Sequence, residues 1–101
     1  MEVNMDIRRF RIFQTVAEEK SFTRAAQKLF MTQPAVSKAI QELELELHLA
    51  LFERFPKKTI LTPEGEQFLD QVQQLLQLYD TMKQKAAILQ ESSVLRIGSS
   101  I

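Results

Sequence analysis

Residues 21–41 of the 101-residue chain read SFTRAAQKLFMTQPAVSKAIQ, and this stretch carries the strongest local indication of the fold. Ser21 and Thr32 each precede a run of helix-forming residues, where a hydroxyl group can accept a hydrogen bond from the first helical turn. The second run carries Pro34 in its first turn, where a missing N–H costs nothing. We therefore expect one helix over 22–29 and another after Thr32, joined by a tight turn.

These two helices are expected to pack closely and to expose one face of the second. Ala26 is small enough to let the helices touch, and apolar Val36 lies ten positions later, where it locks the pair. Such a helix-turn-helix presents its second helix to the major groove of DNA. The exposed positions of that helix can hydrogen-bond base edges or phosphates; they are Gln33, Ser37, Lys38 and Gln41. Its acidic residues lie in the C-terminal half, expected to point away from the duplex: Glu42, Glu44 and Glu46.

The segments on either side complete a small domain. Residues 6–19 space their apolar side chains three to four apart, which predicts an amphipathic helix with Asp6 as its N-cap. Leu51–Arg54 and Thr59–Leu61 predict two short strands, joined in a hairpin by residues 55–58. Three helices followed by such a hairpin form a winged helix-turn-helix.

A long helix is predicted after the hairpin. Thr62 and Pro63 suit a helix start, and the pattern stays helical to about Gln90. Ser92–Ser93 is expected to end the helix, and Val94–Ile101 to begin a strand of a further, truncated domain. The predicted fold is mainly α, with a winged helix-turn-helix over 1–62, a linker and dimerisation helix over 63–91 and the start of an effector-binding domain over 92–101.

The long helix carries an apolar seam. Seven residues repeat at alternating spacings of four and three, an a/d pattern over about three heptads: Phe68, Val72, Leu75, Tyr79, Met82, Ala86 and Leu89. A small winged domain is not expected to cover so long a stripe, so a second copy of the chain is the simplest partner. A second apolar set widens the face and is available to pack on the first helix: Leu69, Leu76 and Leu78.

Charge is balanced overall but uneven along the chain. There are 13 basic and 13 acidic residues, yet residues 20–41 hold four basic residues and residues 54–63 hold three, with no acidic residue in either window. Such windows indicate surfaces for an anion. Ordinary solvated faces are the alternative interpretation.

The composition argues against most enzyme chemistry. The chain has no cysteine, one histidine and two glycines, which leaves no thiolate site, catalytic triad or glycine-rich phosphate loop. We therefore expect no enzymatic activity, no metal and no cofactor. No run approaches the roughly 18 apolar residues of a membrane span, and the polar start over 1–11 is not a signal peptide. A cytoplasmic protein without membrane contact is expected.

Five sequence blocks follow one another in a characteristic order. They are Phe22–Ala26 (FTRAA), Gln33–Ser37 (QPAVS), Leu43–Glu44, Leu51–Arg54 (LFER) and Leu61–Gly65 (LTPEG). From about Met5 to Lys85 the chain thereby resembles the N-terminal domain of LysR-type transcriptional regulators, and Leu95–Gly98 resembles the first strand of that family's effector-binding domain.

The resemblance implies a bacterial repressor or activator that binds an inverted-repeat operator in double-stranded DNA. It also implies a homodimer, with the linker helices packed antiparallel, and leaves room for a higher oligomer in the intact protein. A small-molecule effector would act only through the missing C-terminal domain.

Together with the exposed positions above, the resemblance assigns the DNA contacts. These are Thr23, Arg24, Thr32, Gln33, Pro34, Ser37, Lys38, Gln41, Arg54, Lys57 and Lys58. The first three are phosphate contacts at helix starts, the next five belong to the recognition helix, and the last three belong to the wing. Lys57 and Lys58 are expected at the minor groove or its phosphates. Arg54 matches the family arginine at the base of the wing; a salt bridge with Glu53 or another neighbour is its alternative role.

Two positions depart from the family pattern. His48 stands where the family usually has glycine after the recognition helix, and a left-handed conformation is expected there. We interpret His48 as a helix end rather than as a sensing or catalytic group. Phe55 and Pro56 stand at the wing tip, where small or polar residues are commoner, and are expected to stiffen it.

A protein–protein adaptor is the alternative function. Its coiled coil would then be the functional part, and the basic windows would be solvated faces. The sorting of charge along the third helix and the hairpin favours DNA binding, because an adaptor does not need it.

Overall fold

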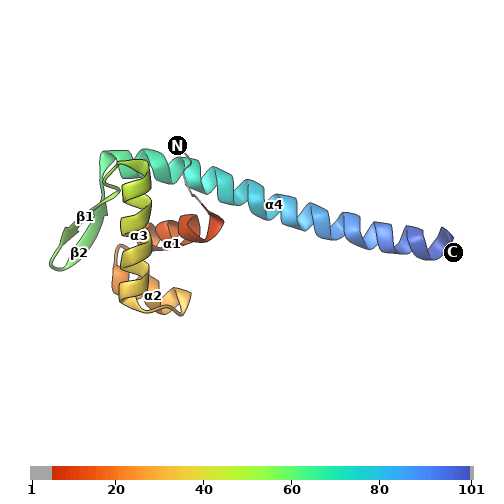
Figure 1. The fold of residues 1–101 in the computed structure, drawn as a ribbon, viewed down its shortest axis with the longest axis horizontal. Coiled ribbons are helices and arrows are strands. Elements are labelled where there is room, and N and C mark those ends of the chain that lie inside the picture. Colours follow the sequence, from red (N-terminus) through yellow and green to blue (C-terminus); the bar gives the residue numbers. More distant parts are fainter. Residues whose placement is uncertain (1–5, 101) are drawn as a thin grey trace.

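A computed structural model describes the backbone of residues 6–100 and the side chains of residues 6–91. Its elements are α1 (Ile7–Glu19), α2 (Phe22–Leu29), α3 (Gln33–Leu47), β1 (Phe52–Phe55), β2 (Lys58–Leu61) and α4 (Pro63–Ser100). The first three helices cluster, the hairpin projects beside α3, and α4 extends away from them (Figure 1). The molecule measures 63 × 32 × 21 Å. The predicted winged helix-turn-helix is confirmed.

The first three helices begin at the predicted caps. The side chains of Asp6, Ser21 and Thr32 each accept the backbone N–H three residues later, at 2.9, 3.1 and 3.2 Å. Each helix is followed by a left-handed residue with φ between 55° and 57°: Lys20, Phe30 and His48. The predicted left-handed helix end at His48 is therefore confirmed. It brings the His48 N–H to the carbonyl of Leu45 at 3.3 Å.

The core forms where α1 crosses the other elements. Phe13 is fully buried, and its ring centroid lies 5.3 Å from that of Phe52 and 5.4 Å from that of Phe68. Ala26 and Val36 are also buried, as the predicted contact between α2 and α3 requires. This packing fixes α3 on the surface of the domain with one face outward.

The acidic residues of α3 make contacts within the domain. Arg9 of α1 donates to Glu46 at 2.7 Å and to Glu42 at 3.4 Å, and the hydrogen bond with Glu46 raises the pKa of Arg9. Glu44 accepts the backbone N–H of Leu51 at 2.7 Å. The acidic side chains in the C-terminal half of α3 therefore bind α1 and the residues at the start of the wing.

The hairpin and the end of α4 differ from the sequence-based expectation. The strands pair from Phe52 opposite Leu61 to Phe55 opposite Lys58, so residues 56–57 form the turn. The predicted break at Ser92–Ser93 and the strand after it are wrong, because α4 runs on to Ser100. Serine lowers helix stability only modestly, and a helix satisfies its own backbone groups whereas a lone strand cannot. Ile101 lies outside the described residues.

The apolar seam of α4 is divided between two environments. Val72 is 2% exposed and packs in the protomer's core together with Leu76, and Phe68 packs edge-on against Phe13. Val72 is therefore covered within the protomer, so the winged domain covers the first turns of the seam and leaves the later turns exposed. The reason is that α1 lies along the first turns. Leu75 is the first seam residue that is clearly exposed.

Candidate nucleic-acid interface

A polar hollow of about 290 Å³ opens between the starts of α2 and α3 and the wing. Its lining residues are Lys20, Ser21, Phe22, Thr23, Gln33, Arg54, Phe55, Pro56, Lys57, Lys58 and Thr59. Four of these side chains are basic and none is acidic. α2 and the start of α3 lie on the side of the domain away from α4 (Figure 1). With its four cations, the hollow is suited to a negatively charged ligand.

Helix geometry adds to the positive potential of this region. Ser21 and Thr32 cap the N-termini of α2 and α3, and the first turn of each helix holds no acidic residue. The free N–H groups and the dipole of a helix N-terminus both favour an anion. At the start of α3, Thr32 already accepts the N–H groups of Ala35 and Val36. What this helix start adds to the hollow is therefore the positive end of its dipole and the side chain of Gln33, which lines the hollow.

Arg54 joins the wing to α3. Its Nη1 donates to Ser37 Oγ at 2.9 Å, and its guanidinium carbon lies 4.0 Å from the centroid of the Phe22 ring. Among residues 6–91, the structure contains no ion pair between Arg54 and Glu53. The alternative role as a salt-bridge partner of Glu53 is thus wrong, because the guanidinium points toward α3 instead.

The structure gathers some of the predicted DNA contacts and separates others. Thr23, Gln33, Arg54, Lys57 and Lys58 line the hollow. Thr32 and four further residues lie outside it but are exposed: Arg24, Pro34, Lys38 and Gln41. Gln41 lies further along α3 and borders a separate hollow with Leu45 and His48.

Lys20 is a residue of the hollow that was not among the predicted contacts. It ends α1 in the left-handed conformation and lines the hollow beside the wing. Its backbone carbonyl accepts the N–H of Thr59 in β2 at 3.3 Å. Lys20 is the first basic residue of the acid-free window over 20–41, so the sequence did indicate it as a candidate for binding an anion. The sequence alone does not reveal that the end of α1 meets the wing.

The wing tip is less polar than its lysines suggest. Phe55 is 46% exposed, and Lys58 Nζ lies 5.8 Å from the centroid of its ring. Pro56 and Lys57 form the turn. The tip therefore offers an apolar surface flanked by two cations, which suits the sugar–phosphate backbone of a nucleic acid.

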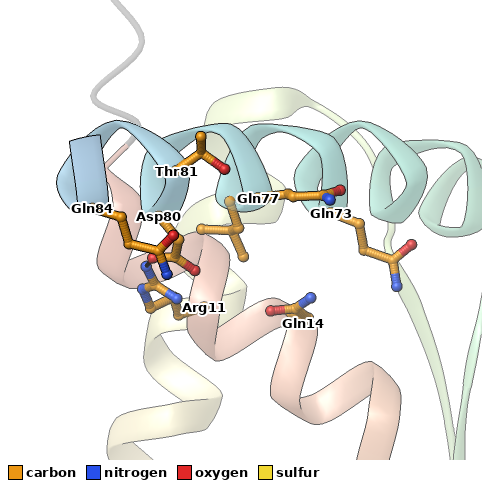
Figure 2. Close-up of a pocket in the computed structure, with 8 residues that line it drawn as sticks. Arg11, Gln14, Gln73, Gln77, Asp80, Thr81 and Gln84 are labelled. Carbon is orange, nitrogen blue, oxygen red and sulfur yellow. Dashed lines mark hydrogen bonds and ion pairs between the residues drawn. The ribbon is translucent and has the colours of Figure 1, made fainter.

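A second polar groove, of about 570 Å³, lies between α1 and α4 (Figure 2). Gln14 on α1 and Gln73 and Gln77 on α4 line it. Its one basic residue, Arg11, donates to Asp80 at 2.6 Å. The paired carboxylate offsets that charge, so this groove lacks the uncompensated cations of the hollow beside the wing.

Comparison with known proteins identifies the family. A family model described as "Bacterial regulatory helix-turn-helix protein, lysR family" matches residues 7–66. The chain belongs to the LysR family. The matched region of this LysR-family chain contains α1, α2, α3 and the wing, with every residue that lines the hollow.

Named relatives are transcriptional regulators. The uncharacterized HTH-type transcriptional regulator YfiE of Escherichia coli is 44% identical over 82 residues, which are 81% of this chain and 28% of the relative. The regulator BenM of Acinetobacter baylyi is 41% identical over 95 residues, or 93% of this chain and 31% of BenM. The chain thus spans about a third of the length of such relatives.

Solved structures share the fold. The BenM DNA-binding domain in complex with benA site 1 DNA has a TM-score of 0.81 at 41% identity, covering 84% of this chain and 96% of that one. The CbnR DNA-binding domain in complex with DNA has a TM-score of 0.78 at 30% identity, covering 81% and 94%. No helix in the described part of this LysR-family chain is long and apolar enough to cross a bilayer.

Proposed function

We propose that this LysR-family domain binds double-stranded DNA sequence-specifically, as a homodimer on an inverted-repeat operator. The observation that carries the proposal is the basic, acid-free hollow between the wing and the starts of α2 and α3. Similar domains of BenM and CbnR have been solved in complex with DNA.

In this proposal, residues of α3 recognise the bases. Gln33 and Ser37 lie four residues apart, on one face of the helix near its N-terminus. A helix-turn-helix places that end of its second helix in the major groove. Lys20, Lys57 and Lys58 then bind phosphates along the groove edge, and the wing tip lies over the minor groove.

In this proposal, the part of α4 that extends beyond the core forms the dimer contact. Leu78 and Met82 are each 58% exposed and Leu89 is 63% exposed. Together with Leu75 and Ala86, these residues extend the apolar face along the exposed length of the helix. Such a face is unfavourable in water and is buried when a second copy of α4 packs on it.

We further infer that three segments of this chain have different roles within a longer protein. Residues 1–62 bind DNA, residues 63–91 hold the dimer, and residues 92–101 lead toward an effector-binding domain that senses a small molecule. The much greater length of the relatives supports this division. The domain itself acts without catalysis, in the bacterial cytoplasm, where a LysR-family regulator meets DNA.

The test is selection of duplexes from a random pool, followed by affinity measurement. We expect enrichment of an inverted repeat with two similar half-sites. Gln33→Ala should weaken binding to that site by roughly 1–3 kcal/mol, the range for a good bidentate base contact. Its binding to random DNA should barely change.

Gln27→Ala is the matched control, since Gln27 is exposed on α2 outside the hollow. It should bind both duplexes like the unmodified chain. An unenriched pool would contradict sequence-specific binding and would favour the adaptor function. Equal losses of Gln33→Ala on selected and random DNA would contradict base recognition by Gln33.

A further inference from the structure

The contact between Arg54 and Ser37 is held in place by the core of the domain. Arg54 donates to Ser37 Oγ at 2.9 Å while its guanidinium lies over the Phe22 ring. Phe22 is 7% exposed, and its ring packs edge-on against Phe52 with centroids 5.8 Å apart. The guanidinium therefore rests on an aromatic surface that cannot move without disturbing the core, and this fixes the direction of its donors.

The chemistry of the two groups decides what Ser37 can offer to a ligand. A guanidinium carries five N–H donors and no acceptor, whereas a hydroxyl has one donor and two acceptor sites. Ser37 Oγ must therefore be the acceptor toward Arg54, and its own hydrogen points elsewhere.

Within residues 6–91, no acceptor is found for the hydrogen of the Ser37 hydroxyl. The hydroxyl of Thr15 in α1 provides the contrast, because it donates to the carbonyl of Arg11 at 2.8 Å. Ser37 is thus left with an unused donor on the side of α3 that carries Gln33.

We propose that Arg54 is a positioning residue that makes Ser37 a hydrogen-bond donor toward a base edge of DNA. The inference rests on the DNA-binding function proposed above. In the major groove, purine N7, guanine O6 and thymine O4 are acceptors, whereas cytosine presents only the donors of its amino group. If Ser37 can only donate toward the base that it contacts, the domain binds less tightly when that base is cytosine. A phosphate oxygen also accepts such a bond but carries no base identity, so base preference separates the two targets.

The experiment measures affinity for the selected operator with each of the four bases placed in turn at every half-site position. It compares the unmodified chain with Ser37→Ala, Arg54→Met and the double variant. At one position we expect cytosine to weaken binding of the unmodified chain roughly fivefold, the value of one ordinary hydrogen bond. Each single variant should lose this discrimination, and the double variant should lose no more than either.

Arg54→Lys separates positioning from charge. A lysine keeps the positive charge but lacks the planar fork that stacks and donates in a fixed direction. This variant should lose the discrimination while keeping the dependence of affinity on salt. It also serves as the second test if circular dichroism shows that Arg54→Met does not fold.

Two results would overturn the proposal. If Arg54 only binds phosphate, Arg54→Met will weaken binding to all sequences equally and leave the base preference due to Ser37 intact. If Ser37→Ala binds less tightly with an unchanged base profile, Ser37 contacts a phosphate rather than a base. If the unmodified chain shows no base preference at any position, the proposed function itself is contradicted. If the base preference is present and unchanged in the Arg54 variants, only this inference is contradicted.

Discussion

The carboxylate of Glu44 accepts the backbone N–H of Leu51 at 2.7 Å, one residue before the wing begins. The same oxygen accepts the N–H of Phe52 at 3.3 Å. Glu44 lies on the recognition helix, and Leu51 and Phe52 are buried. An acidic side chain of α3 thereby sets the position of the wing relative to α3.

Glu44→Ala should lower the free energy of unfolding by about 1–3 kcal/mol, because it leaves two backbone donors without their acceptor. Urea denaturation measures this change. Glu53→Ala removes an exposed acid from β1 and should change stability by no more than about 0.5 kcal/mol. Similar midpoints for the two variants would show that Glu44 does not anchor the wing.

Gly65→Ala should destabilise the domain even though alanine is the better helix former. A Cβ at this position would overlap the carbonyl oxygen of Leu51, which is already held by the N–H of Thr62 at 3.0 Å. We expect a loss of about 1–3 kcal/mol in thermal or urea unfolding, as for other overpacked sites. Gln67→Ala, at an exposed position of the same helix, is the control and should not destabilise. A Gly65→Ala variant as stable as this control would show that α4 can shift away from Leu51.

Lys57→Ala with Lys58→Ala should weaken binding to all duplexes to a similar degree. Each phosphate contact that is lost should reduce the slope of log K against log salt by about 1. Lys83→Ala with Lys85→Ala removes the same charge from α4, away from the hollow, and should leave the slope nearly unchanged. A wing variant with the original slope would show that the wing does not neutralise phosphates.

Leu75 and Leu76 are neighbours on α4 with different expected roles. Leu75 is 39% exposed, whereas Leu76 is 3% exposed and belongs to the core. Leu75→Glu should keep the helical circular-dichroism spectrum and dissociate the dimer in sedimentation. The affinity for the operator should fall steeply when the dimer dissociates. In the dimer, binding of one recognition helix to its half-site holds the second helix at high effective concentration near the other half-site.

Leu76→Ala should show the reverse behaviour. It should lower the stability of the domain by about 2–5 kcal/mol, as for other buried leucines, and keep the dimer wherever the domain remains folded. A folded Leu75→Glu variant that still sediments as a dimer would place the dimer contact elsewhere.

The elements whose ends depend on local chemistry were predictable from the sequence alone. Asp6, Ser21 and Thr32 accept hydrogen bonds from residues three positions away, so their caps are visible in a short window of sequence. The left-handed end at His48 and the helix start at Thr62 are equally local. Helix periodicity likewise predicted that α1 is amphipathic, with one apolar face.

Which distant side chains meet was not predictable in this way, because it depends on the tertiary structure. The contacts of Arg54 with Ser37 and Phe22, and of Glu44 with Leu51, depend on where the wing folds back onto α3. The heptad pattern of α4 could not tell Val72 from Leu75, because spacing shows that a face is apolar but not what covers it. What covers it depends on the path of α1, which lies more than fifty residues away in sequence from both.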